Sequence, residues 1–114
     1  MKYSVIFSSG YIDDDEAQMK GYRSDVIIRD DKDNYFEVNI VTPELLENAL
    51  NQDKICYLET NLVIMKQITK SNILLSIKDL DQWLFYKRWK PLSNEQIQKY
   101  YFPKEKWTIF DVDV

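Results

Sequence analysis

The sequence predicts one α+β domain, built as a two-layer sandwich in which two or three helices cover one face of a mixed or mainly antiparallel sheet. Three observations predict this class. The 114 residues suit a single domain, so residues 1–114 are expected to fold as one unit. Apolar residues make up 45% of the chain, and two glycines and three prolines are too few for a flexible linker. The element patterns run in the order strand, two strands, helix, one or two strands, two helices and strand, which is typical of this architecture.

The N-terminal third carries three strand patterns. Apolar and polar side chains alternate in "YSVIFS" (residues 3–8), which indicates a strand rather than the apolar segment of a signal sequence. The runs "SDVIIRD" and "YFEVNIVT" are rich in β-branched and aromatic residues, and the Asp and Asn of the connecting "DKDN" favour a turn. We therefore predict a β-hairpin whose second arm places Phe36, Val38 and Ile40 on one face.

Three helices have start signals in the sequence. Thr42 can cap the free amides of a helix that begins at Pro43, where a missing N–H is harmless. Thr69 can cap a second helix, whose apolar residues form one stripe. Ser93 and Gln96 have the spacing of a capping box and predict a third, shorter helix. The stripe of the second helix consists of Ile73, Leu74, Ile77, Leu80 and Leu84.

Strands are also expected in the middle and at the end of the chain. Residues 54–68 have the pattern of two short strands or one bent strand, and the run 62–65 is apolar on both faces, which predicts a central strand. Cys56 is the single cysteine, so it forms no disulfide within the chain, and its apolar neighbours predict a small buried side chain. The alternation in residues 107–114 indicates the last strand.

The composition excludes several kinds of active site. The chain has no histidine, which removes the commonest general base and the nucleophile pairs that depend on it. Neither Gly10 nor Gly21 belongs to a glycine-rich phosphate loop. The acidic "DDKDN" resembles the start of a calcium loop, but Phe36 and Thr42 occupy the positions where that loop needs Gly and Glu. We therefore expect no enzyme activity, no cofactor and no metal, and, without an apolar run of about eighteen residues, no membrane partner.

Charge is distributed unevenly along the chain, which has a net charge of −4. Residues 11–33 contain eight acids and four bases, a net charge of −4, whereas residues 66–106 contain four acids and nine bases, a net charge of +5. An acidic surface steers in a basic protein and repels nucleic acid at long range. We therefore predict a partner-binding surface made of acidic residues from the first third of the chain. The candidates are Asp13, Asp14, Asp15, Glu16 and Asp31.

The segment "QWLFYKRWK", which includes residues 83–90, supports a competing interpretation. Its aromatic side chains, interleaved with lysine and arginine, could stack on bases and hold phosphates, as in a small adaptor or nucleic-acid-associated domain. Alternatively, Trp83 and Phe85 complete the core stripe of the preceding helix, or the segment anchors a protein interface. The net acidity disfavours nucleic acid. The protein is expected to be a monomer, or a homodimer through aromatic residues near the C-terminus. Those residues are Tyr100, Tyr101 and Trp107.

Two runs within residues 21–80, "GYRSDVIIRDDKDNYFEVNIVTPELLENAL" and "NLVIMKQITKSNILLSIKDL", resemble a pattern found in small bacterial immunity proteins. These are the cognate inhibitors encoded beside polymorphic or contact-dependent growth-inhibition toxins. The shared features are a strand-turn-strand ending in "VTPELL", the run "LVI" and a helix that opens with "TKSNI". The resemblance implies a cytoplasmic, non-enzymatic protein that binds one toxin domain, in many cases a nuclease, and blocks its basic substrate surface. It transfers no individual contact residue.

Overall fold

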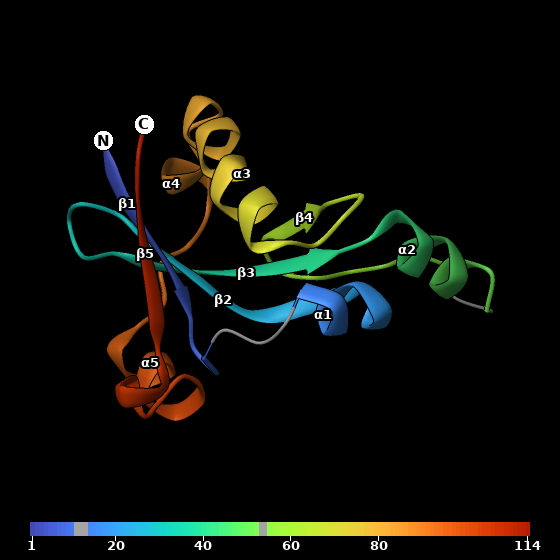
Figure 1. Ribbon diagram of the computed structural model, residues 1–114, viewed down its shortest axis with the longest axis horizontal. Helices are drawn as coiled ribbons and strands as arrows, with labels where there is room; N and C mark the ends of the chain where they lie inside the picture. Colours follow the sequence, from blue (N-terminus) through green and yellow to red (C-terminus); the bar gives the residue numbers. More distant parts are fainter. Residues whose placement is uncertain (11–13, 53–54) are drawn as a thin grey trace.

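The computed structural model describes residues 1–10, 14–52 and 55–114, and it contains a five-stranded sheet in the order β4–β3–β2–β1–β5 (Figure 1). Strands β3, β2, β1 and β5 are joined antiparallel, and β4 joins β3 in parallel. The predicted α+β class and the mixed, mainly antiparallel sheet are therefore confirmed. The strands are β1 (Lys2–Phe7), β2 (Tyr22–Arg29), β3 (Tyr35–Val41), β4 (Leu62–Ile64) and β5 (Thr108–Asp113).

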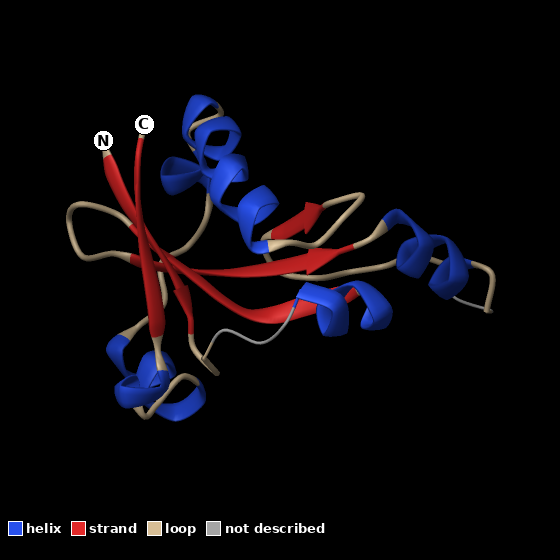
Figure 2. Cartoon of the chain, in the orientation of Figure 1, coloured by secondary structure: helices blue, strands red, loops and turns tan. Residues whose placement is uncertain are grey.

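Helices lie on both sides of the sheet and beyond one end of it (Figure 2). α3 and α4 lie together on one side, α5 lies on the other, and α2 projects at the end farthest from the two termini (Figure 1). Within the described parts of the chain, no helix is both long and apolar enough to cross a membrane. The helices are α1 (Asp14–Lys20), α2 (Pro43–Leu50), α3 (Lys70–Gln82), α4 (Phe85–Arg88), α5 (Asn94–Tyr100) and the 3₁₀ turn η1 (Lys104–Lys106).

The main core lies between the sheet and helices α3 and α4. The odd-numbered residues of β1 point into this core, as the alternation predicts, and Tyr3 is 1% exposed. α3 contributes Ile73 and Ile77, which lie one helical turn apart and are both buried. The ring of Phe85 in α4 packs between Tyr3 and Phe36, with both ring centroids 5.4 Å away. Burying aliphatic and aromatic side chains of this size contributes about 1.5–3 kcal/mol each, so this layer dominates the stability of the fold.

The opposite face of the sheet is partly covered by the α5 segment. Ile6 and Ile27 lie on this face and are fully buried. Alternation places Glu37 on the face opposite to Phe36, and the hydroxyl of Tyr101 donates to Glu37 Oε2 over 3.0 Å. Burial and the negative charge of Glu37 raise the pKa of Tyr101 above its ordinary value. α5 thus adds a small cover to the second face of the sheet, while α3 and α4 cover the first.

The structure corrects three expectations for burial. The run 62–65 does not form a central strand, because β4 lies at the edge of the sheet and leaves Ile64 54% exposed. Residues 55–61 form neither helix nor strand, and Cys56 is exposed, because this segment returns from α2 to the sheet outside the core. Leu84 leaves the predicted stripe, since its positive φ of 56° turns the chain at the end of α3 and leaves the side chain 43% exposed.

Candidate functional site

Asp14, Asp15 and Glu16 form the first turn of the short helix α1, which the sequence patterns did not predict. Carboxylates in a first helical turn are stabilised by the partial positive charge of the helix N-terminus. Glu16 pairs with Lys20 one turn later, with 2.8 Å between Nζ and Oε1. The hydrogen bond and the charge of Glu16 raise the pKa of Lys20. This i,i+4 pair was a helix signal in the sequence. Asp15 and Glu16 are both exposed on α1, while Asp13 lies outside the described residues.

Asp14 has a structural role that the sequence did not suggest. Its Oδ1 accepts a hydrogen bond of 2.8 Å from the backbone N–H of Lys70, the first residue of α3. Gln18 makes a second link of the same kind, because its Oε1 accepts from the backbone N–H of Ile68 over 2.8 Å. Both acceptors satisfy amides that precede or open α3 and lack a partner within that helix. Asp14 therefore holds α1 against the start of α3.

Asp31 lies far from α1. It is exposed in the turn between β2 and β3, where the carboxylate of the buried Asp30 accepts from the backbone N–H of Lys32 over 2.9 Å. The two strands pair along their length, and α1 adjoins the end that begins at Tyr22, opposite to this turn (Figure 1). The structure thus brings together Asp14, Asp15 and Glu16, but it places Asp31 at the other end of the hairpin.

The C-terminus of α1 and the N-terminus of α2 are joined directly at Gly21. The backbone N–H of Thr42 donates to the carbonyl of Gly21 over 2.8 Å. Gly21 has a φ of +78°, and a Cβ on it would lie 3.1 Å from Thr42 Oγ1 and 3.3 Å from the Cβ of Leu45. Glycine is required here both by the left-handed conformation and by the close approach. This joint fixes the two helices at one end of the molecule.

The apolar side of α2 does not enter the core. None of the residues of α2 is buried, although four of its eight are leucine or alanine, and Leu50 is 45% exposed. A groove of about 460 Å³ separates α2 from the β2–β3 surface. The segment after α2 adds further exposed apolar side chains, with Ile55 100% and Leu58 85% exposed. The lining of the groove includes Tyr22, Leu45, Ala49, Tyr57 and Glu59.

The same end of the molecule is acidic. We define the α1–α2 surface as the exposed and half-buried residues of α1, α2 and residues 55–60. Within it, Lys20 is the one base among the described residues, and it is paired with Glu16. An open apolar groove beside an excess of carboxylates suits a partner that is basic and has apolar side chains to bury. The exposed acids of this surface are Asp15, Glu16, Glu44, Glu47 and Glu59.

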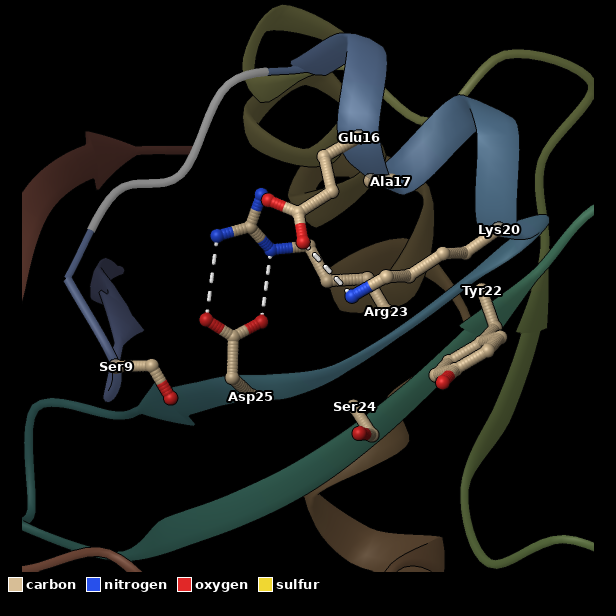
Figure 3. Close-up of a pocket in the computed structure, with 8 residues that line it drawn as sticks. All are labelled: Ser9, Glu16, Ala17, Lys20, Tyr22, Arg23, Ser24 and Asp25. Atoms are coloured by element: carbon tan, nitrogen blue, oxygen red, sulfur yellow. Dashed lines mark hydrogen bonds and ion pairs between the residues drawn. The ribbon is translucent and has the colours of Figure 1, made fainter.

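A smaller hollow of about 230 Å³ lies beneath α1 (Figure 3). The buried Arg23 on its floor donates through Nε to Asp25 Oδ1 over 2.8 Å and through a terminal nitrogen to Oδ2 over 3.2 Å. The guanidinium group also lies 4.4 Å from the centre of the Phe7 ring. On the opposite wall, Glu16 and Lys20 pair with each other. Arg23 is thus paired with Asp25, and Glu16 with Lys20, around the hollow on which α1 lies.

The basic-aromatic segment 83–90 divides between core and surface. Phe85 is 2% exposed and belongs to the main core, as the core interpretation predicts. Trp83 is 66% exposed, contrary to that interpretation, because it caps the C-terminus of α3 and turns away from the sheet. Lys87, Arg88 and Lys90, which follow it in the sequence, are also exposed. The segment therefore combines a buried anchor with an exposed Trp and three bases.

Two further findings bear on the site. Among the residues that the structure describes, no three Cys, Asp or Glu side chains come close enough together to hold a metal ion. Compared with known proteins, the chain matches no family model, no curated protein and no solved structure. The apolar half of the α1–α2 surface is the part that sequence reasoning missed. The amphipathic pattern of residues 43–50 indicates a helix with one apolar side. The same pattern is expected for a helix that packs against the core, so it does not distinguish an open surface from a buried one.

Proposed function

We propose that this chain is a cytoplasmic immunity-type protein that binds and neutralises a cognate toxin domain, and that it contacts the toxin through the α1–α2 surface. One observation carries the proposal. α2 is capped and tied to α1, yet its apolar side is no more than half-buried and borders an open groove, next to five exposed carboxylates. A helix that the fold holds in place with its apolar side incompletely buried is typical of a helix that contacts a partner.

The arrangement suits rapid and tight association with a basic protein. The centre of a protein interface is apolar and its rim is polar, which matches the open groove of α2 and the carboxylates around it. Opposite charge on the partner raises the association rate, and fully desolvated apolar anchors slow dissociation. If the toxin is a nuclease, its substrate surface is basic, and the carboxylates of α1 and α2 would occupy positions that phosphates occupy in the substrate.

The proposal is tested with the proteins whose genes lie next to the gene for this chain. Each neighbouring protein is co-expressed with the wild-type chain, growth is measured, and any purified pair is titrated by calorimetry. We expect growth rescue and a stoichiometric complex with one basic protein. Reversing two carboxylates in Glu47→Lys/Glu59→Lys should weaken binding at least about tenfold, with the loss mainly in the association rate and larger at low salt. Both side chains are exposed, so the fold should be unaffected.

A matched variant controls for net charge. Glu95→Lys/Glu105→Lys changes the charge by the same amount on α5 and η1, outside the α1–α2 surface, and should leave binding unchanged. A single Asp31→Lys variant tests the hairpin turn separately. Equal losses in both double variants would show a nonspecific charge effect and contradict the proposed surface. Loss in Asp31→Lys alone would move the contact to the turn.

A second candidate function rests on the exposed Trp83, which is followed in the sequence by the exposed Lys87, Arg88 and Lys90. Such a cluster can stack on a base and contact phosphates, as in proteins that bind single strands. The test is the fluorescence anisotropy of a labelled single-stranded oligonucleotide against the wild type and Trp83→Ala. Salt-dependent binding that Trp83→Ala abolishes would favour this candidate. We expect no saturable binding at physiological salt, because the chain has a net charge of −4.

A further inference from the structure

The second surface of interest is the open edge of β4. The N–H of Asn39 donates to the carbonyl of Asn61, and the N–H of Met65 donates to the carbonyl of Val41, so these groups of the β4 segment point towards β3. Backbone groups of successive residues alternate in direction along a strand. The N–H and C=O groups of Leu62 and Ile64 therefore point away from β3, to the open edge of the sheet.

The two edges of the sheet differ in how they are protected. β5, at the opposite edge, carries the exposed carboxylates of Asp111 and Asp113. Charged side chains on an edge strand oppose the addition of another strand. β4 has the sequence "LVI", without any charge, and Ile64 is 54% exposed. Among the described residues, the outward N–H and C=O groups of Leu62 and Ile64 have no backbone partner, so the β4 edge offers hydrogen-bonding groups and apolar surface together.

α3 extends this apolar edge. A groove of about 610 Å³ runs between β4 and α3, and its lining includes Ile64, Met65, Leu75 and Leu80. Leu75 lies in the middle of α3 and is 71% exposed. It is the member of the apolar series of α3 that turns away from the core, and it stands beside the β4 edge. An added strand would therefore also bring apolar side chains over Leu75.

We propose that β4 pairs with β4 of a second copy of this chain, forming a symmetric homodimer with one continuous sheet. An antiparallel pair with its two-fold axis at Val63 places Leu62 opposite Ile64 of the second copy. Each such pair exchanges two backbone hydrogen bonds, because both residues direct their N–H and C=O groups outward. The axis is perpendicular to the sheet, so the two α3 helices lie on the same side and Leu75 of each copy faces the groove of the other.

Charge and symmetry select a second copy as the occupant. Bases and acids are mixed around this edge, because Lys66 and Asp79 both line the groove and Lys78 precedes Asp79 in α3, so we expect no strong repulsion between two copies there. The α1–α2 surface, by contrast, has an excess of carboxylates that would oppose contact with itself. A two-fold interface also requires a self-complementary patch, and an antiparallel edge strand meets this condition. The proposed dimer is built from β4 and α3 and uses neither α1 nor α2, so we expect it to be independent of toxin binding.

The test is the mass of the purified full chain by sedimentation equilibrium between about 5 and about 500 μM, a range that covers weak interfaces. We expect the mass to rise reversibly from 13.7 kDa towards twice that value. Ile64→Lys places a charge on the open edge and should keep the protein monomeric throughout. Ile109→Lys is the matched control, since Ile109 is 45% exposed on β5 at the other edge, and it should dimerise like the wild type.

A wild type that stays monomeric at the highest concentration would overturn the proposal. So would a dimer that Ile109→Lys abolishes and Ile64→Lys does not. Amide hydrogen exchange supplies a readout that needs no substitution, because the N–H groups of Leu62 and Ile64 should become protected only as the concentration rises. In the toxin titration, Ile64→Lys should bind as well as the wild type, which separates failure of the dimer from failure of the proposed function.

Discussion

Helices α2 and α3 begin with the same local signals, but they differ in how deeply their apolar sides are buried. Each begins after a threonine whose hydroxyl accepts a hydrogen bond from a backbone N–H in the first turn, at Leu45 in α2 and Asn72 in α3. Each has an apolar side. In α3 that side contains the buried Ile73 and Ile77, whereas in α2 no residue is buried.

The difference shows that a capped amphipathic helix is not in itself a core element. α3 follows β4 and lies along the face of the sheet, so its apolar side enters the main core. α2 follows β3 beyond the end of the sheet, where its position is set by the joint between Gly21 and Thr42. Substitutions on α3 should therefore act on stability, and substitutions on α2 should act on binding.

The largest expected effect on stability distinguishes the apolar side of α3 from the apolar side of α2. Ile77→Ala removes a fully buried side chain and leaves a cavity, so it should lower the free energy of unfolding by about 3 kcal/mol. Leu50→Ala removes a side chain that is already 45% exposed and should change it by less than about 1 kcal/mol. Urea denaturation followed by circular dichroism measures both values. Equal losses would mean that the apolar side of α2 stabilises the fold as strongly as that of α3.

The second-largest effect on stability is expected at the joint between α1 and α2. Gly21→Ala forces a left-handed residue to carry a Cβ that lies 3.1 Å from Thr42 Oγ1, so it should destabilise the chain by about 1–2 kcal/mol. Because the joint positions α2, binding of the proposed toxin partner should weaken as well. Urea denaturation and calorimetry measure the two effects. Full binding with lowered stability would show that the position of α2 does not matter to the partner.

Removal of the two capping side chains should lower stability by similar amounts, but the effect should spread over different parts of the chain. Thr42→Ala and Thr69→Ala each remove a capping acceptor and should cost about 1 kcal/mol within their own helix. Native-state hydrogen exchange locates the effect. Thr69→Ala should raise exchange throughout the core, since α3 belongs to it, while Thr42→Ala should raise exchange in α2 alone. A global response to Thr42→Ala would contradict the independence of α2.

The smallest expected effect concerns a hydrogen bond that links β1 to α3. The hydroxyl of Tyr3 donates to Asp81 in α3, and burial, this hydrogen bond and the carboxylate charge raise the pKa of Tyr3 above its ordinary value of 10.0. The unfolded chain loses this proton at a lower pH than the folded chain. The associated stability is therefore complete below pH about 10 and declines as the pH rises further.

Tyr3→Phe isolates this contribution. The urea midpoint of the wild type should fall between pH 8 and pH 11, and Tyr3→Phe should fall less over the same range. The tyrosine of α5, Tyr101, also has a raised pKa and remains in both proteins, so part of the decline persists. Tyr101→Phe serves as the comparison. Identical pH profiles for the wild type and Tyr3→Phe would show that the link to Asp81 does not depend on the proton of Tyr3.

The sequence by itself determined the hairpin, the last strand, and the starts of α2, α3 and α5. The capping box is an example, because Ser93 and Gln96 bond to each other's backbone N–H in the structure as their spacing predicts. Such signals act between residues only a few positions apart, through hydrogen bonds and side-chain periodicity. Asp15 and Glu16 were named as candidates from the charge of their segment alone, and the helix α1 that carries them was not predicted.

Only the tertiary structure decided which apolar residues are covered. It placed β4 at an edge, left Cys56 and the side of α2 outside the core, and separated Asp31 from α1 by the length of the hairpin. It also gave Asp14 a backbone partner at Lys70, fifty-six positions along the chain. An apolar side chain has the same chemistry in a core and at an interface. Its burial depends on which distant segments the chain brings against it, and no local pattern contains that information.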